Sequence, residues 1–259
     1  MSLRTTPLGR MTLRPLPEIG KEVDELSLEQ RRAVGRRWAM RAVAERTVAE
    51  SMRRVARALE ALGAKELAAV AVRAMDDEQR HAAICAHVAS RYLGRDVPSP
   101  PPMTDVVPEY VGAAPPLLHV LTVVGMCAVN ETTATVYLEA SLARAATVLV
   151  AAATRELLAD DVDHARIGWA LLASLDTNAR AAVAPWVKPM LAANLARWRE
   201  RPPEDAGSTL AAHGCLSAAD VDAAALAAIR DLILPGFESL HIDTTEARAW
   251  LSAIDKPID

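Results

Sequence analysis

The sequence has few aromatic residues, few cysteines and no motif that binds a nucleotide. Its 259 residues include five Trp, three Tyr and a single Phe, Phe237. The three cysteines, Cys85, Cys127 and Cys215, are far apart and form no C-x-x-C pair, which argues against a zinc ribbon, a rubredoxin-type iron site and a disulfide framework. A P-loop and a Gly-rich dinucleotide fingerprint are also missing. Any chemistry must therefore depend on other residue types.

A strong charge of one sign and a long apolar run are absent as well. The formal net charge is −4, and no basic run with interleaved aromatic residues occurs, so we expect no nucleic-acid partner. The first 20 residues contain three prolines and no apolar core of signal-peptide length. The most apolar stretch, 117–129, is interrupted by His119 and Gly125 and is too short to span a bilayer. We therefore expect a cytoplasmic protein that contacts no membrane.

Alanine and leucine dominate the composition and predict an all-α fold, because these residues lose little entropy in a helix. The segment S-L-E-Q at 27–30 has the pattern of a capping box and predicts a helix that runs to about Leu62. Gly63 breaks it, and a second helix over 64–92 ends at Gly94. With almost no loop between them, the two helices must form an antiparallel hairpin.

A proline-rich connection separates this hairpin from a second one. Residues 97–116 contain seven prolines and cannot be helical. Residues 117–175 contain none, and we expect two helices there with a turn near 145–147, although no Gly or Pro marks it. Two helical hairpins joined by a long crossover resemble the topology of a ferritin-like four-helix bundle.

The predicted organisation has three parts. These are an extended N-terminal arm over 1–26, the four-helix bundle over 27–176, and C-terminal helices over 177–259 that pack on the bundle. The helices expected in the last part cover 177–199, 217–234 and about 244–253. Pro235 and Gly236 should break the chain between the last two.

Each predicted hairpin contains one carboxylate–histidine pair. The segment D-D-E-Q-R-H at 76–81 contains Glu78 and His81, and A-D-D-V-D-H at 159–164 contains Asp161 and His164. Residues three apart share a helix face, so each pair can bind one metal ion. A third pair, Glu238 with His241, follows Pro235–Gly236 outside the predicted long helices, and we treat it as coincidental.

The other helix of each hairpin supplies a glutamate at the height of the pair. The midpoint in sequence between Glu45 and the 78–81 pair lies near the first turn, and the midpoint between Glu131 and the 161–164 pair lies near the second. Residues equally far from the turn of an antiparallel hairpin lie at the same height. Four carboxylates and two imidazoles are the ligand set of di-iron carboxylate bundles. The alternative is a metal-free helical module with its carboxylates on solvated faces, because burying four unpaired acids would cost several kcal/mol.

Residues 28–175 resemble the ferritin-like superfamily of di-iron carboxylate proteins. The segment D-E-Q-R-H at 77–81 is similar to the motif of the oxygen-activating branch, which includes bacterial multicomponent monooxygenase hydroxylases and ribonucleotide reductase small subunits. The resemblance implies that Asp77 orients His164 and that Asp160 orients His81. It also implies a catalytic threonine at Thr135, four residues after the glutamate of the third helix.

Two residues depart from the family pattern. Asp161 stands where a glutamate is usual, so its metal ion should lie closer to its helix or be bridged differently. Asp163 takes the place that Arg80 has in the first motif, and we expect it to add negative charge to the site.

The resemblance implies a non-haem di-iron oxygenase or oxidase. It would use two iron ions and dioxygen to oxidise a small organic substrate by hydroxylation, desaturation or N-oxygenation. An iron–manganese or manganese centre suits the same ligands. A ferroxidase or iron-handling protein and a metal-free interaction module are the alternatives. An electron-donating reductase is a candidate partner, and a homodimer is the alternative to a monomer.

Overall fold

The computed structural model describes residues 16–17, 23–101, 104–200 and 208–255. Every regular element within these ranges is helical, and they contain no strand. The predicted all-α class is thus confirmed. Of the predicted N-terminal arm, Val23 and Leu26 are buried against the core, whereas residues 1–15 and 18–22 lie outside the described part of the chain.

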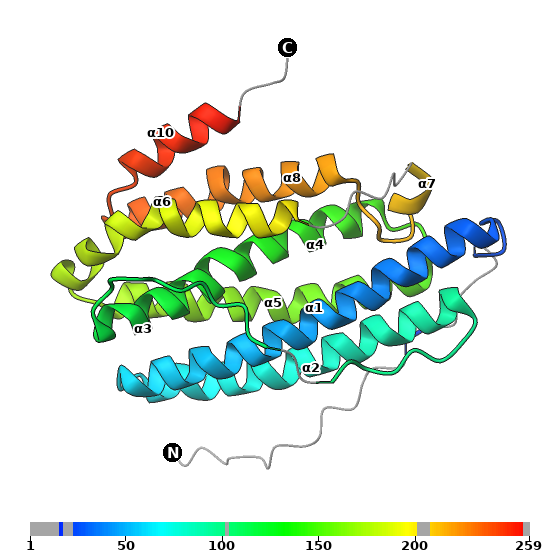
Figure 1. Cartoon of the computed structure of the whole chain (residues 1–259), viewed down its shortest axis with the longest axis horizontal. Helices are drawn as coiled ribbons and strands as arrows, with labels where there is room; N and C mark the ends of the chain where they lie inside the picture. Colours follow the sequence, from blue (N-terminus) through cyan, green and yellow to red (C-terminus); the bar gives the residue numbers. More distant parts are fainter. Residues whose placement is uncertain (1–15, 18–22, 102–103, 201–207, 256–259) are drawn as a thin grey trace, which may run out of the picture.

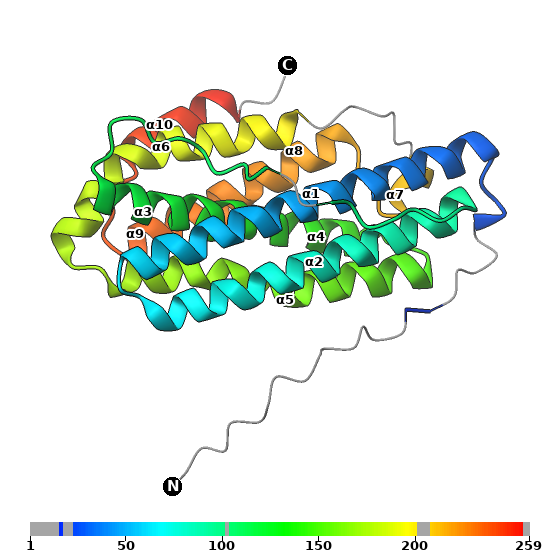
Figure 2. The same ribbon diagram turned by 60° about the horizontal axis from the view of Figure 1, so that its bottom comes forward.

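The first two helices form the predicted antiparallel hairpin. Helix α1 (Leu28–Ala61) begins at a capping box, in which the Ser27 hydroxyl accepts from the Gln30 N–H and the Gln30 amide oxygen accepts from the Ser27 N–H. A turn at Gly63, with φ of 74°, leads to α2 (Lys65–Leu93). Helix α2 ends at Gly94 in the left-handed conformation that glycine favours. The two helices lie side by side over their whole length (Figures 1 and 2).

The second hairpin consists of one long segmented helix and α5 (Val148–Ser174). The long helix runs through α3 (Pro115–Val123), the π-helix η2 (Val124–Glu131) and α4 (Thr132–Arg144). The turn between α4 and α5 falls where it was predicted, and the Thr147 hydroxyl caps α5 by accepting from the Val150 N–H. The π-helix was not predicted.

The connection from α2 to α3 runs back along the molecule (Figure 1). No described residue between Gly94 and Ala114 is helical. Because of this return path, α2 and the α3–η2–α4 helix run in the same direction, and α1 and α5 run in the opposite one.

The C-terminal helices cover one side of the α3–η2–α4 helix. They are α6 (Thr177–Arg199), α7 (Ser208–Ala211), α8 (Ala218–Ala227), the π-helix η3 (Ala228–Ile233), α9 (Leu234–Ser239) and α10 (Thr245–Ile254). Helix α6 contacts α3 and η2, α8 contacts α4 and α6, and α10 contacts α6. Buried apolar residues of these helices and of both hairpins form one core cluster.

The predicted chain break at Pro235 and Gly236 is wrong. The helix continues through both residues in α9 and ends at Ser239, shortly before His241 with φ of 59°. The π-helix η3 directly precedes α9, in which Pro235 is the second residue, and its wider turn accommodates the missing N–H. Gly236 serves packing instead, since a Cβ atom built on it would lie 2.6 Å from the Trp169 ring.

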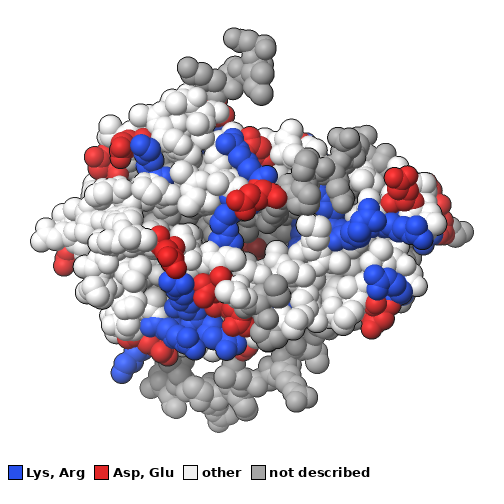
Figure 3. Space-filling view, in the orientation of Figure 1, with Lys and Arg blue, Asp and Glu red and all other residues white. Residues whose placement is uncertain are grey.

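The continuous helix Pro115–Arg144 lies in the middle of the molecule. By length and composition alone it could cross a membrane, contrary to the expectation that its apolar stretch is too short. However, 72% of its most apolar window is buried inside this protein, as expected for the core helix of a bundle. On the face shown in Figure 3, basic and acidic side chains are interspersed.

Candidate metal centre

All six predicted metal ligands meet in the interior between the two hairpins. They are Glu45 from α1, Glu78 and His81 from α2, Glu131 from η2, and Asp161 and His164 from α5. Glu45 is half-buried, and each of the other five residues exposes 5% of its surface or less. The carboxylates therefore do not lie on solvated faces.

The potential ligand atoms form two groups that share one residue. In the first group, atoms of Glu78, Glu131, Asp161 and His164 lie within 4.8 Å of one another. In the second, atoms of Glu45, Glu78 and His81 do so. Glu78 belongs to both groups, so its carboxylate lies between two positions at which a cation could bind.

The two imidazoles present the same nitrogen to this centre. Glu78 Oε1 lies 2.9 Å from His164 Nδ1, and Glu78 Oε2 lies 3.4 Å from His81 Nδ1. Asp161 Oδ1 lies 3.6 Å from each of the two Nδ1 atoms. The shorter aspartate thus still reaches between the two histidines.

The outward nitrogen of each histidine faces an acid from the opposite hairpin. His81 Nε2 lies 2.9 Å from Asp160 Oδ2, at hydrogen-bonding distance. His164 Nε2 lies 3.6 Å from Asp77 Oδ2, which is too far for a direct hydrogen bond. The structure places both acids beside the histidines that the family resemblance assigned to them. A carboxylate in this position fixes the tautomer that leaves Nδ1 free to bind a metal.

Arg80 joins these outer acids across the two hairpins. Its guanidinium group hydrogen-bonds to Asp160 and lies 3.5 Å from Asp77 and 3.6 Å from Glu156. The sequence identified Arg80 as part of the first motif, but its contacts with α5 depend on the packing of the hairpins.

Several buried polar atoms at the centre make no hydrogen bond of acceptable geometry to any described residue. They are both carboxylate oxygens of Glu78, Asp161 Oδ1, and the Nδ1 atoms of His81 and His164. Buried polar atoms normally have a partner, and leaving one without costs about 1–3 kcal/mol. Carboxylate oxygens and imidazole nitrogens are ligands of iron and manganese. Two cations among these atoms would satisfy all of them, so the residues fit a di-metal cofactor.

The carboxylates of the centre cannot all stay ionised without cations. Burial, together with the charge of Glu78, raises the pKa of Glu45 to about 8 and that of Asp161 to about 7. The same two causes raise the pKa of Glu131 well above its usual value. Burial alone would also raise the pKa of Glu78, but its contacts with His164 and His81 bring it below the usual range.

The histidines carry the compensating protons in the absence of metal. Burial opposes their charged form, but contacts with Asp77 and Glu78 raise the pKa of His164 to about 11. Contacts with Asp160 and Glu78 likewise raise the pKa of His81 well above its usual value. The interior is therefore arranged to hold positive charge between the carboxylates.

A chain of amide side chains braces Glu131. Asn130 Nδ2 donates to Glu131 Oε1 at 3.1 Å, and Asn194 Nδ2 donates to Asn130 Oδ1 at 3.3 Å. The Thr133 hydroxyl, which donates to the Val129 carbonyl at 2.8 Å, also lies 3.2 Å from Asn194 Oδ1. Sequence reasoning missed this network, because Asn194 comes from α6, outside the two hairpins, and no motif marks it.

Two other residues that were predicted to contribute to the site, Thr135 and Asp163, make no side-chain contact at its centre. The Thr135 hydroxyl donates to the Glu131 backbone carbonyl at 2.9 Å, and Thr135 does not line the neighbouring cavity, so its catalytic role stays a prediction. Asp163 is exposed and pairs with Arg166 at 2.6 Å. The expectation that Asp163 adds negative charge to the site is therefore wrong.

The Glu238–His241 pair does not form a metal site. Glu238 bonds to Arg248 and Thr244 near the C-terminus of the described chain. Neither member belongs to a group of potential ligand atoms among the described residues.

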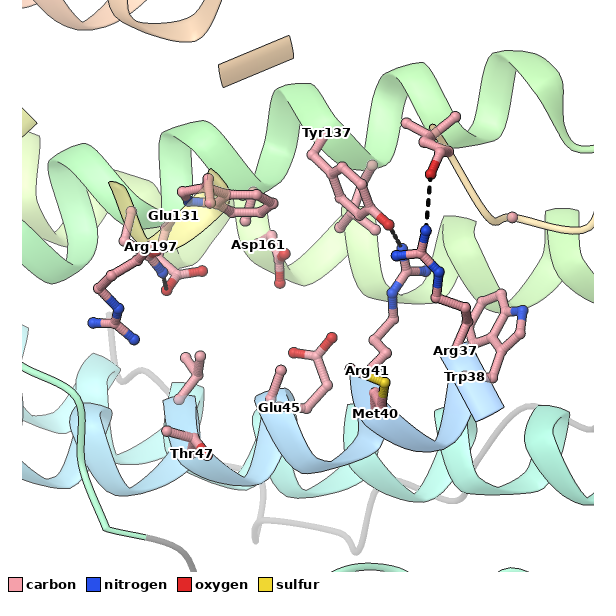
Figure 4. A pocket seen from close by; sticks show the side chains of 18 of the residues that line it. Arg37, Trp38, Met40, Arg41, Glu45, Thr47, Glu131, Tyr137, Asp161 and Arg197 are labelled. Carbon is pink, nitrogen blue, oxygen red and sulfur yellow. Dashed lines mark hydrogen bonds between the residues drawn. The ribbon is translucent and has the colours of Figure 1, made fainter. Parts of the chain in front are cut away.

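A cavity of about 350 Å³ adjoins the centre. Glu45, Glu131 and Asp161 line it together with residues of α1, α4, α6 and the segment that precedes α8 (Figure 4). Trp38, Tyr137 and Trp198 contribute aromatic surface to its wall. Volumes of this size accommodate small organic molecules.

Comparisons of the chain with protein-family models, curated proteins and solved structures give no match. The geometry of the candidate metal centre and of the cavity is therefore the only indication of function.

Proposed function

We propose that this protein is a ferritin-like, non-haem di-iron oxidoreductase that uses dioxygen to oxidise a small organic substrate. The observation that carries the proposal is the position of Glu78 between two ligand groups, each of which contains one histidine. Two helical hairpins joined by a long connection support the ferritin-like assignment, since such bundles supply one Glu from each of two helices and a carboxylate–histidine pair from each of the other two.

The ligand groups divide between two metal positions. Glu45, Glu78 and His81 would hold one ion, and Glu131, Asp161 and His164 the other, with Glu78 shared. Two bound ferrous ions would supply the electrons that reduce dioxygen. The surrounding residues would orient the ligands: Asp160 fixes the imidazole ring of His81 by a hydrogen bond. Asp77 faces His164 from 3.6 Å, and Arg80 pairs with both acids.

Burial and the cavity favour this function over its alternatives. A metal-free interaction module would leave Glu78, Glu131 and Asp161 in the interior without partners for their charge. An iron-handling protein needs no space for an organic molecule, whereas a 350 Å³ cavity opens beside Glu45 and Asp161. A cytoplasmic location, an electron-donating reductase and a homodimer remain part of the proposal.

The test is anaerobic loading with Fe(II), a count of bound iron, and exposure to oxygen while the absorbance is recorded. We expect about two irons per chain in the wild type and about one after His81→Ala or His164→Ala. His87→Ala is the matched control, because His87 is an exposed histidine on α2, and it should leave the iron count unchanged. Absence of stoichiometric uptake would overturn the proposal. Iron oxidation that no organic compound accelerates would support iron handling instead.

A further inference from the structure

The cavity beside the metal centre has an uneven distribution of charge. Figure 4 shows Glu45 and Asp161 pointing toward each other near its middle, with Arg41 and Arg37 at one end. Arg197 lies at the opposite end, near Glu131. The acidic residues belong to the metal centre, so the arginines need a separate explanation.

Arg41 has aromatic neighbours in place of a carboxylate partner. Its guanidinium group donates to the Tyr137 hydroxyl and lies 4.7 Å from the centre of the Trp38 ring and 4.9 Å from that of the Tyr137 ring. No carboxylate in the described part of the chain forms an ion pair with it, and its Nη1 atom is buried without a hydrogen-bond partner there. Aromatic faces stabilise a cation, but they leave its hydrogen-bond donors unused.

Metal binding does not remove this imbalance. Two divalent cations would compensate the four ligand carboxylates, Glu45 included, and leave them little charge to offer Arg41. Asp77 and Asp160 face Arg80 and make no ion pair with Arg41. A loaded centre therefore leaves a positive charge at the Arg41 end of the cavity, and an anion is the group that would satisfy it.

The rest of the wall defines the body that this anion would carry. Ala134, Leu138 and Trp198 contribute apolar surface to the wall of the cavity. A dry cavity of roughly 150 Å³ is enough for a benzene ring, so about 350 Å³ has room for a substituted ring. Tryptophan and tyrosine surfaces pack well against the faces and edges of such a ring.

We propose that the cavity binds a small aromatic carboxylate. The Arg41 guanidinium group donates hydrogen bonds to the carboxylate, and the ring extends toward Glu45 and Asp161. The planar donor fork of arginine matches the two oxygens of a carboxylate. Binding of the carboxylate does not require the proposed function. Only the expectation that the bound ring is oxidised at the metal centre rests on it.

The test is calorimetric titration of the iron-loaded protein, kept anaerobic, with benzoate and with its uncharged analogue benzamide. We expect benzoate to bind at least about tenfold more tightly than benzamide, because a charge-assisted hydrogen bond contributes that much or more. Arg41→Gln should weaken benzoate binding at least about tenfold, and Arg41→Lys should fall between the two. Arg197→Gln is the matched control at the other end of the cavity and should bind benzoate like the wild type.

Two results would overturn the inference. Unchanged benzoate affinity in Arg41→Gln would show that the carboxylate binds iron or another group instead. If only Arg197→Gln lost affinity for benzoate, the carboxylate would bind at the Arg197 end of the cavity and not at Arg41. The iron content of the same samples tests the proposed function separately, since benzoate binding through Arg41 in a chain without two irons would defeat the oxidoreductase and leave the carboxylate site standing.

Discussion

Replacing Gly168 with alanine should destabilise the protein and weaken the metal centre. Gly168 lies in α5, one turn after His164, where α5 packs against η2. A Cβ atom built on Gly168 would lie 2.4 Å from Ala128 N and 2.8 Å from Ala128 Cβ, whereas ordinary contacts begin near 3.4 Å. The closest atom belongs to a helix backbone and not to a flexible side chain, so the two helices must move apart.

The size of the effect follows from two opposing terms. Overpacking a tight core contact costs about 1–3 kcal/mol. Alanine regains about 1 kcal/mol over glycine within a helix. The net loss should reach about 2 kcal/mol at most, which corresponds to a fall in melting temperature of up to roughly 8 °C for a chain of this size.

The same displacement should reach the metal centre. Ala128 precedes Glu131 by three residues in η2, so moving η2 away from α5 also moves Glu131 away from Asp161 and His164. We expect Gly168→Ala to bind its second iron more weakly than the wild type. Calorimetry of the metal-free protein and an iron count after anaerobic loading measure the two effects.

Gly35→Ala is the matched control. A Cβ atom on Gly35 in α1 would lie 2.5 Å from Leu93 Cγ, which is part of a side chain that can rotate away. Its melting temperature should change less, and its iron content should not change. A Gly168→Ala protein with the melting temperature and the iron content of the wild type would refute the reasoning.

Three further predictions concern the ligands and their supports. Metal binding should tighten as pH rises from 6 to 8, because raised pKa values keep His81 and His164 protonated in the metal-free protein and a bound metal displaces those protons. Each proton released should strengthen binding roughly tenfold per pH unit. Metal titrations that show no pH dependence would contradict this. Arg80→Gln should lower metal affinity roughly 10–100-fold by releasing the outer acids, while Asp163→Asn, a change at an exposed residue, should leave the affinity as it is. Asn194→Ala should reduce the free energy of unfolding by about 1 kcal/mol and loosen the second metal position, which denaturant unfolding and an iron count would detect; equal values in both assays would exclude the bracing role.

The hairpins were predictable because their ends carry local signals. Ser27 and Gln30 form the capping box that their spacing indicated, and Gly94 has the left-handed conformation that ends a helix. The turn before α5 has neither signal, but the proline-free stretch is too long for one ordinary helix, and the midpoint between Glu131 and the 161–164 pair agrees with its position.

Features that depend on packing between distant segments were not predictable. The π-helix η2 has no glycine or proline pattern of its own, although it holds Glu131. Pro235 and Gly236 have the local signature of a break, but the wide turn of η3 and the Trp169 ring next to Gly236 allow the helix to continue. Asn194 braces the centre from α6, a helix that the ligand pattern does not include.

The wrong prediction for Asp163 had a different cause. Asp163 was assigned to the centre by its position in the motif, but a residue two positions after Asp161 on a helix faces another direction and pairs with Arg166. The cavity-lining residues Arg41 and Arg197 come from α1 and α6, so their proximity to the same space could not be read from either segment alone.

The most direct measurement is anomalous X-ray diffraction at the iron edge from crystals loaded anaerobically with Fe(II). The proposal predicts two peaks about 3.5–4 Å apart on either side of the Glu78 carboxylate, one next to His81 Nδ1 and the other next to His164 Nδ1. No peak in the interior, or peaks only at surface carboxylates, would contradict a di-iron centre in this protein.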